Sequence, residues 1–82
     1  MVASAQIAIY PLRQERLTPA VRAVQQALRS HGLAAQPGPM STYVVGEADA
    51  IFAALRDALV QAAATGHVVM AMTVSNACPL PE

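Results

Sequence analysis

The sequence predicts an α+β fold in which a four-stranded antiparallel sheet carries two helices on one face. Two observations lead to this prediction. Strand-like and helix-like stretches follow one another along the 82 residues in the order βαββαβ. Right-handed crossovers in both βα units then place the first and third strands at the centre of the sheet.

The first strand is expected over residues 5–10, which are rich in β-branched and aromatic side chains and are followed by Pro11. Strand alternation puts Ala5, Ile7 and Ile9 on one face and the intervening residues on the other. We expect the first set to pack against the helices. The second set is mixed in character and is expected to be exposed or to face a partner.

The first helix is expected to start at Thr18-Pro19, with Thr18 as N-cap and proline at the first helical position. Its apolar stripe recurs at helical spacing and comprises Leu17, Val21, Val24 and Leu28. The helix is expected to end near Gly32, because glycine readily adopts the left-handed conformation after a helix.

The second helix is expected over residues 47–65, with Glu47 and Asp49 in the first turn, where the helix dipole favours negative charge. Gly66 follows its end. The side chains that we expect this helix to bury are Ile51, Phe52, Leu55, Leu59 and Ala62.

Three further strands complete the prediction. Residues 33–36 form a weak strand that Pro37-Gly38-Pro39 ends, and such a strand belongs at a sheet edge. Residues 40–45 form the third strand, with Gly46 ending it, and residues 68–75 form the last. The result is a ferredoxin-like sandwich. Because both helices cover the same face, the other face of the sheet is left open to a ligand or to another subunit.

Composition limits the class of protein. With 55% hydrophobic residues, 12% charged residues and no net charge, the chain matches neither a disordered segment nor a nucleic-acid binder. No apolar run is long enough to span a membrane, and no signal peptide is visible. A single cysteine, Cys78, fits a reducing compartment. We therefore expect one domain, over residues 4–79, in a cytoplasmic protein.

The core is expected to be thin. Eighteen of the apolar residues are alanines, each of which buries little surface. Small domains of this kind are often stabilised by association. We expect a homo-oligomer, either a dimer or a tetramer.

No catalytic set or metal site can be assembled from the sequence. His31 and His67 lie at the ends of the two expected helices, where a histidine commonly satisfies free carbonyls, and neither has metal-ligand spacing to another residue. Cys78 has no base on its side of the last strand, and no two carboxylates are placed to share a pocket. We expect no enzymatic activity, no metal and no cofactor.

Neutral polar side chains on the strands form the remaining candidate site. Hydroxyl and amide groups around an apolar floor suit a planar heterocycle with little charge, and they do not suit a phosphate. Ser41 and Thr42 are adjacent, so only one of them can line a given floor. The candidate ligand-binding residues are Gln6, Tyr10, Ser41, Thr42, Thr73 and Ser75.

Three short blocks of the sequence resemble the YkoF-like family, whose members bind thiamine and its hydroxymethylpyrimidine moiety. The blocks are residues 4–11 with their Tyr-Pro ending, residues 40–46 with the pattern Ser-Thr-x-x-x-Gly, and residues 67–70 with Thr73 and Cys78-Pro79. The resemblance covers about residues 4–79. It implies a ferredoxin-like unit that binds the pyrimidine part of thiamine without transforming it, in vitamin B1 uptake, salvage or buffering. Family members with the closest motif carry two units in one chain, whereas this sequence carries one.

Two interpretations remain open at this stage. The first is a non-enzymatic protein that binds thiamine or hydroxymethylpyrimidine, within one subunit or between two. The alternative is an oligomeric structural or regulatory module whose open sheet face serves only for association, without a thiamine ligand.

Overall fold

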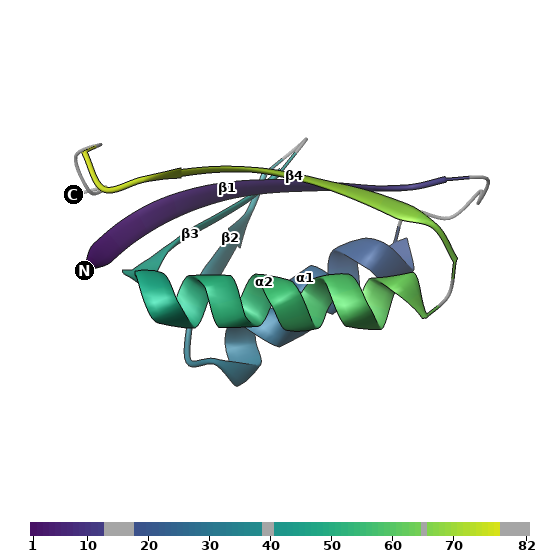
Figure 1. Cartoon of the computed structure of the whole chain (residues 1–82), viewed down its shortest axis with the longest axis horizontal. Coiled ribbons are helices and arrows are strands. Elements are labelled where there is room, and N and C mark those ends of the chain that lie inside the picture. Colours follow the sequence, from purple (N-terminus) through teal and green to yellow (C-terminus); the bar gives the residue numbers. More distant parts are fainter. Residues whose placement is uncertain (13–17, 39–40, 65, 78–82) are drawn as a thin grey trace.

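Six elements follow one another in the computed structural model, which describes residues 1–12, 18–38, 41–64 and 66–77. They are β1 (Val2–Pro11), α1 (Thr18–Ser30), β2 (Ala35–Pro37), β3 (Thr42–Glu47), α2 (Ala48–Ala63) and β4 (Val68–Ser75). The strands form one antiparallel sheet in the order β2-β3-β1-β4. Both helices lie against the same face of this sheet (Figure 1). The predicted ferredoxin-like order and the central place of the first and third strands are confirmed.

The core lies between this face and the helices, and the alternation of β1 supplies much of it. Ala5, Ile7 and Ile9 are buried beneath the sheet, as expected, whereas Gln6 and Tyr10 on the opposite face are exposed. The helices contribute small and branched side chains, which allow a close approach to the strands. The largest fully buried side chains are Ile7, Leu28, Ile51, Val24 and Val44.

Two backbone hydrogen bonds at the ends of β1 reveal which way its peptide groups point. Leu12 N–H donates to His67 O (2.8 Å), next to the β1–β4 ladder, and Ala48 N–H donates to Met1 O (2.9 Å), next to the β1–β3 ladder. Hydrogen-bonded pairs recur at every second residue of an antiparallel ladder. Even-numbered residues of β1 therefore bond to odd-numbered residues of β4, and odd-numbered residues of β1 bond to β3.

The second helix differs from its prediction at two positions that were expected to be buried. Phe52 and Leu59 are 48% and 42% exposed, so the expectation that they are core residues was wrong. At about 100° per residue, both lie roughly a quarter turn from Ile51, which faces the core. The opposite flank carries Asp57, which contacts His31 just after α1, and Gln61, which contacts Gln26 of α1. The exposed pair therefore lies on the flank of α2 that faces away from α1.

Several boundaries of the helices and strands also differ from the prediction. β1 begins at Val2, β3 ends at Glu47 and α2 ends at Ala63, whereas the sequence placed these limits at residues 5, 45 and 65. Gly46 lies inside β3 and does not end it. A glycine suits this strand position because the side chain of Leu33 fills the space that a Cβ would need. Gly32 follows α1 with a φ of +76°, as expected.

The histidine at the end of α1 joins the two helices. His31 Nε2 lies 2.8 Å from Asp57 Oδ2 of α2, so its side chain pairs with a carboxylate instead of the helix carbonyls that we expected. His67 precedes β4 and is exposed. Cys78 lies outside the described residues.

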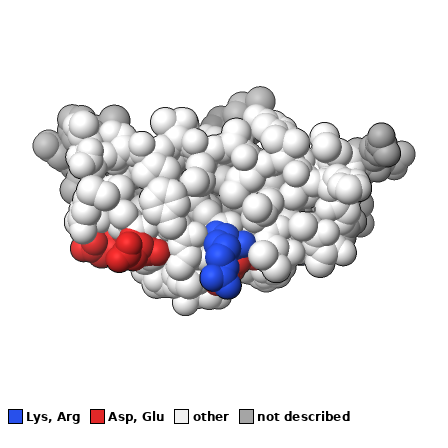
Figure 2. Space-filling view, viewed as in Figure 1, with Lys and Arg blue, Asp and Glu red and all other residues white. Residues whose placement is uncertain are grey.

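Charged side chains are confined to a few places among the described residues. Glu47 is the one charged residue within the strands, and the others lie on α1 and α2. Figure 2 shows the face made by α2 and β4, on which the charges gather along the α2 border. The described part of the sheet is thus almost free of charge.

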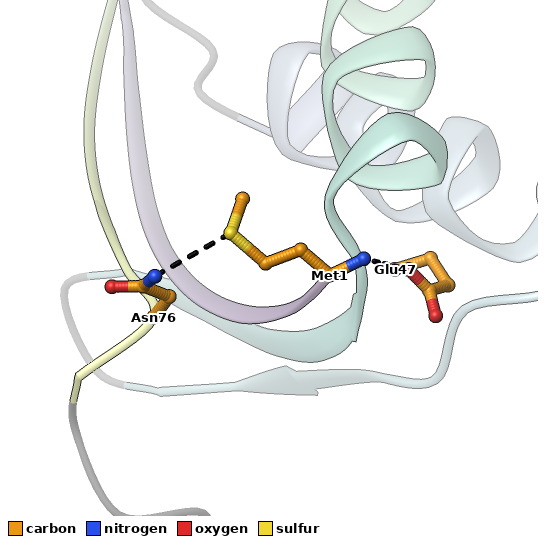
Figure 3. Close-up of polar contacts among 3 residues, drawn as sticks. All are labelled: Met1, Glu47 and Asn76. Carbon is orange, nitrogen blue, oxygen red and sulfur yellow. Dashed lines mark hydrogen bonds and ion pairs between the residues drawn. The ribbon is translucent and has the colours of Figure 1, made fainter.

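Met1 connects the start of β1 to the last residue of β3 and to Asn76, which follows β4 (Figure 3). Its ammonium nitrogen lies 2.8 Å from Glu47 Oε2, and its sulfur accepts a hydrogen bond from Asn76 Nδ2 at 3.4 Å. The hydrogen bond to Glu47 and the attraction between the two charges raise the pKa of the Met1 amino group above its usual value of 8.0.

Candidate functional site

A hollow of about 130 Å³ opens where β1 extends beyond the paired part of β3. It lies between the sheet, the first half of α1 and the turn that joins β2 to β3. The described residues that line it are Ile7, Ala8, Ile9, Tyr10, Val21, Val24, Gln25, Pro37, Gly38, Ser41 and Thr42. Most of these side chains are apolar and none is charged.

Polar groups are few and come from three sides of the hollow. Thr42, at the start of β3, is buried at 5% exposure, and Ser41 beside it is half-buried. Gln25 of α1 also borders the hollow, as does Tyr10 of β1, whose side chain lies on the open face of the sheet. The adjoining turn is closed by a hydrogen bond from Gly38 N–H to Ser41 O at 2.7 Å. Both hydrogen-bond donors and acceptors are therefore available around an apolar floor.

The backbone of β1 adds a further donor and acceptor. The β1–β3 pairing extends from Val2 to Ile7. Since odd-numbered residues of β1 turn their peptide groups away from β4, the N–H and C=O of Ile9 point to the side on which the hollow opens. A planar ligand edge with alternating donors and acceptors is complementary to such a strand segment.

The volume of the hollow limits the size of the group that can bind in it. An apolar cavity of about 150 Å³ admits one benzene ring. A hollow of about 130 Å³ thus suits a single six-membered ring, with any larger group remaining outside. None of the described residues in its lining is charged, and such neutral groups stabilise a phosphate or a cation poorly.

The structure divides the six predicted site residues into two groups. Tyr10, Ser41 and Thr42 line the hollow. Gln6, Thr73 and Ser75 lie on the open face of the sheet, where Gln6 is paired with Thr73. The Ser75 hydroxyl accepts a hydrogen bond from Ala77 N–H at 3.0 Å. The two groups are not brought together.

Sequence reasoning missed the contribution of α1 to the hollow. Gln25 lies next to Val24 and one turn after Val21, both of which are part of the predicted apolar stripe. A glutamine that borders such a stripe can be recognised from the sequence alone. It does not indicate which strand ends above that side chain.

Other kinds of site find no support in the described ranges. Among these residues, no group of three or more histidine, cysteine, aspartate or glutamate side chains is placed to hold a metal ion. Neither α1 nor α2, which are the helices of the described chain, has the length and apolar character needed to cross a membrane.

Solved structures share the fold. A hypothetical protein from Methanocaldococcus jannascii matches with a TM-score of 0.85 and 18% identity, over 98% of this chain and 84% of its own. A Streptococcus pneumoniae protein matches with a TM-score of 0.81 and 23% identity, over 92% and 86%. A candidate thiamine biosynthesis/salvage protein from Thermotoga maritima matches with a TM-score of 0.76 and 18% identity, over 90% and 82%. At these identities the matches establish the fold alone.

Together, the fold and the hollow define a small ferredoxin-like module with one candidate ligand site. A search of curated proteins found no match to the sequence. The family model of thiamine-binding proteins matches residues 5–76, which is most of the chain. This chain belongs to the thiamine-binding protein family.

Proposed function

We propose that this protein binds thiamine through its hydroxymethylpyrimidine group and releases it chemically unchanged. The observation that carries the proposal is the ring-sized, uncharged hollow between β1, α1 and the β2–β3 turn. Membership of the thiamine-binding family supports thiamine as the chemical class of the ligand. The Thermotoga maritima neighbour, described as a candidate thiamine biosynthesis/salvage protein, is consistent with that class.

The aminopyrimidine ring matches the groups around the hollow. Its exocyclic amine is a donor and its ring nitrogens are acceptors, so it needs a few neutral partners at fixed positions. The hydroxyl of Thr42, the amide of Gln25 and the peptide group of Ile9 offer such partners. The cationic thiazolium ring of thiamine stays outside in this proposal, because none of the described residues that line the hollow carries a carboxylate.

The proposal includes a non-catalytic role in the cytoplasm, in uptake, salvage or buffering of vitamin B1. It also includes a homo-oligomer, since one face of the sheet carries no helix (Figure 1). The described part of that face is rich in neutral side chains, with Gln6, Tyr43 and Thr73 at its centre. A role limited to association, without a ligand, is the alternative that the binding experiment must exclude.

Isothermal titration of the purified protein with three ligands tests the proposal. We expect thiamine and free hydroxymethylpyrimidine to bind with similar affinity, because both present the same ring to the hollow. The isolated thiazole alcohol is expected not to bind. Binding of the thiazole alone, or of none of the three, would contradict the proposal. Recovery of unchanged ligand by chromatography tests the non-catalytic part.

A further inference from the structure

The end of β1 carries backbone hydrogen-bonding groups that no described strand uses. In the β1–β3 ladder, the hydrogen-bonded pairs of the described residues extend as far as Ile7 and Thr42. Ile9 occupies the next position of this kind, and none of the described residues of β3 is paired with it. On its other side, Ile9 lies opposite Met70 at a non-hydrogen-bonded position. Its N–H and C=O therefore both point to the side on which the hollow opens.

The donor and the acceptor of Ile9 are fixed in their order and direction. Its neighbours along the chain, Ala8 and Tyr10, are hydrogen-bonded to β4, which holds this part of β1 extended. The Ile9 side chain is 7% exposed and is anchored in the core. The N–H and the C=O of one extended residue lie side by side, and the chain direction determines which comes first. Neither group can exchange its role with the other.

The polar side chains at the hollow are adaptable by comparison. The hydroxyls of Ser41 and Thr42 rotate, so each can donate or accept a hydrogen bond. The amide of Gln25 can turn over and exchange its oxygen for its nitrogen. These groups can bind a ring that presents an amine as well as one that presents a carbonyl. The peptide of Ile9 cannot, because its donor and acceptor are both fixed.

We propose that the peptide of Ile9 makes this site selective for 4-aminopyrimidines over 4-oxopyrimidines, an inference that rests on the proposed function. The exocyclic amine donates to Ile9 O, and the adjacent ring nitrogen accepts from Ile9 N–H. The edge of the ring thereby takes the place that a further residue of β3 would have in the ladder. This is the main-chain pairing by which an extended peptide adds to a sheet, here made by a heterocycle.

A 4-oxopyrimidine presents the opposite pattern to the same peptide. It carries a carbonyl in place of the amine and an N–H at the adjacent ring position. Its acceptor then faces Ile9 O and its donor faces Ile9 N–H, so neither hydrogen bond forms. Each unpaired group in an apolar site weakens binding by roughly tenfold to a hundredfold. We therefore expect the oxo ring to bind at least about a hundredfold more weakly than the amino ring.

Shape does not account for such a difference. An amine and a carbonyl oxygen have nearly the same size, and the hollow of about 130 Å³ accommodates either ring. Turning the oxo ring over would restore the pairing, but it would move the substituent at carbon 5 to the other end of the ring edge. The thiazolium of thiamine is attached through this substituent. The ratio of the two affinities thus reports the hydrogen bonds to Ile9.

Titration calorimetry of the parent protein with hydroxymethylpyrimidine and with its 4-oxo analogue tests the selectivity. Thiamine and the 4-oxo analogue of thiamine form a second matched pair. We expect a ratio of at least about a hundredfold in both pairs. Equal affinity within a pair overturns the selectivity and leaves the proposed function intact. If none of the four ligands binds, the proposed function fails and the selectivity fails with it.

Two side-chain variants show whether the backbone is responsible. Thr42→Val and Gln25→Leu each remove an adaptable polar group from the hollow and leave the peptide of Ile9 in place. Both variants are expected to bind both rings more weakly, by a similar factor, so that the ratio between amino and oxo rings is kept. A ratio that falls to about one in either variant assigns the selection to that side chain and overturns the proposal.

Amide hydrogen exchange, followed by NMR, observes the peptide directly. At saturation with hydroxymethylpyrimidine, the Ile9 amide is expected to exchange at least about tenfold more slowly than in the free protein. The Tyr10 amide is the control, because it is already hydrogen-bonded to Val69 of β4, and its exchange is expected to change little. An Ile9 amide whose exchange is the same in the free and the saturated protein overturns the proposal.

Discussion

Thr42 of β3 is paired with Ile7 of β1, and both side chains lie on the face of the sheet that the helices cover. The Thr42 hydroxyl therefore reaches the hollow, where it lies among apolar side chains. Gln6, one residue before Ile7, points to the opposite face. A single step along β1 thus separates the interior of the proposed ligand site from the open surface.

Removing the Thr42 hydroxyl is expected to weaken ligand binding. Thr42→Val keeps the shape of the side chain, and loss of one buried hydrogen bond to the ligand costs about 1–3 kcal/mol, or roughly tenfold to a hundredfold in affinity. Titration calorimetry with hydroxymethylpyrimidine measures the change. Thr73→Val is the matched control, because Thr73 lies on the open face, and it is expected to bind like the parent. The reverse result would move the ligand to the open face.

Filling the hollow is expected to block binding without unfolding the protein. Gln25→Trp, at a half-buried position in α1, places a bulky ring where the ligand ring would lie. Binding is expected to become undetectable by calorimetry, while the circular dichroism spectrum stays that of the parent. Gln26→Trp, one residue further on the exposed side of α1, is the control. If Gln25→Trp binds normally, the hollow is not the site.

Core packing of α2 is expected to be far more sensitive than its outer surface. Ile51→Ala removes a side chain that is fully buried, and such truncations cost about 2–5 kcal/mol. Val60→Ala alters a side chain that is 65% exposed and is expected to change stability by less than about 0.5 kcal/mol. Urea unfolding at equal protein concentration compares the two variants. Equal losses would contradict the described orientation of α2.

The contact between His31 and Asp57 is expected to contribute little to the stability of the fold. His31 and Asp57 side chains are 29% and 49% exposed, and pairs this open to solvent contribute about 0–1 kcal/mol. Asp57→Asn should therefore lower the free energy of unfolding by no more than that amount, in a salt-dependent way. A double-mutant cycle with His31→Gln isolates the coupling. A coupling well above this range would show that the pair is more shielded than its exposure indicates.

The contact between Met1 and Glu47 is expected to weaken at alkaline pH. The pKa of the amino group is raised above 8.0 in the folded protein, so the folded state binds the proton more tightly than the unfolded state. The stabilisation is complete below pH 8.0 and is lost as the pH rises through the raised pKa. An NMR titration that follows the amide of Ala48, which donates to Met1 O, reports the transition. In Glu47→Gln the midpoint should fall toward 8.0.

Local sequence patterns determined most of the secondary structure. The alternation around Ile7 and the helical spacing from Val21 to Leu28 are properties of residues close in the chain, and each identifies the side that avoids water. The order of these elements, with right-handed crossovers, then determined the sheet order and the common side of both helices. The neutral polar residues of the strands could be named for the same reason, because alternation is visible without the partner strand.

Only the tertiary structure decided which of these residues meet. Among the described residues, the β1–β3 pairing extends no further than Ile7 and Thr42, and the hollow lies beside the part of β1 that follows Ile7. Register depends on contacts between segments distant in the chain, so alternation alone could not separate Thr42 from Gln6. The rotation of α2, which leaves Phe52 exposed, was likewise decided by packing, because the side of α2 that meets α1 is chosen by α1.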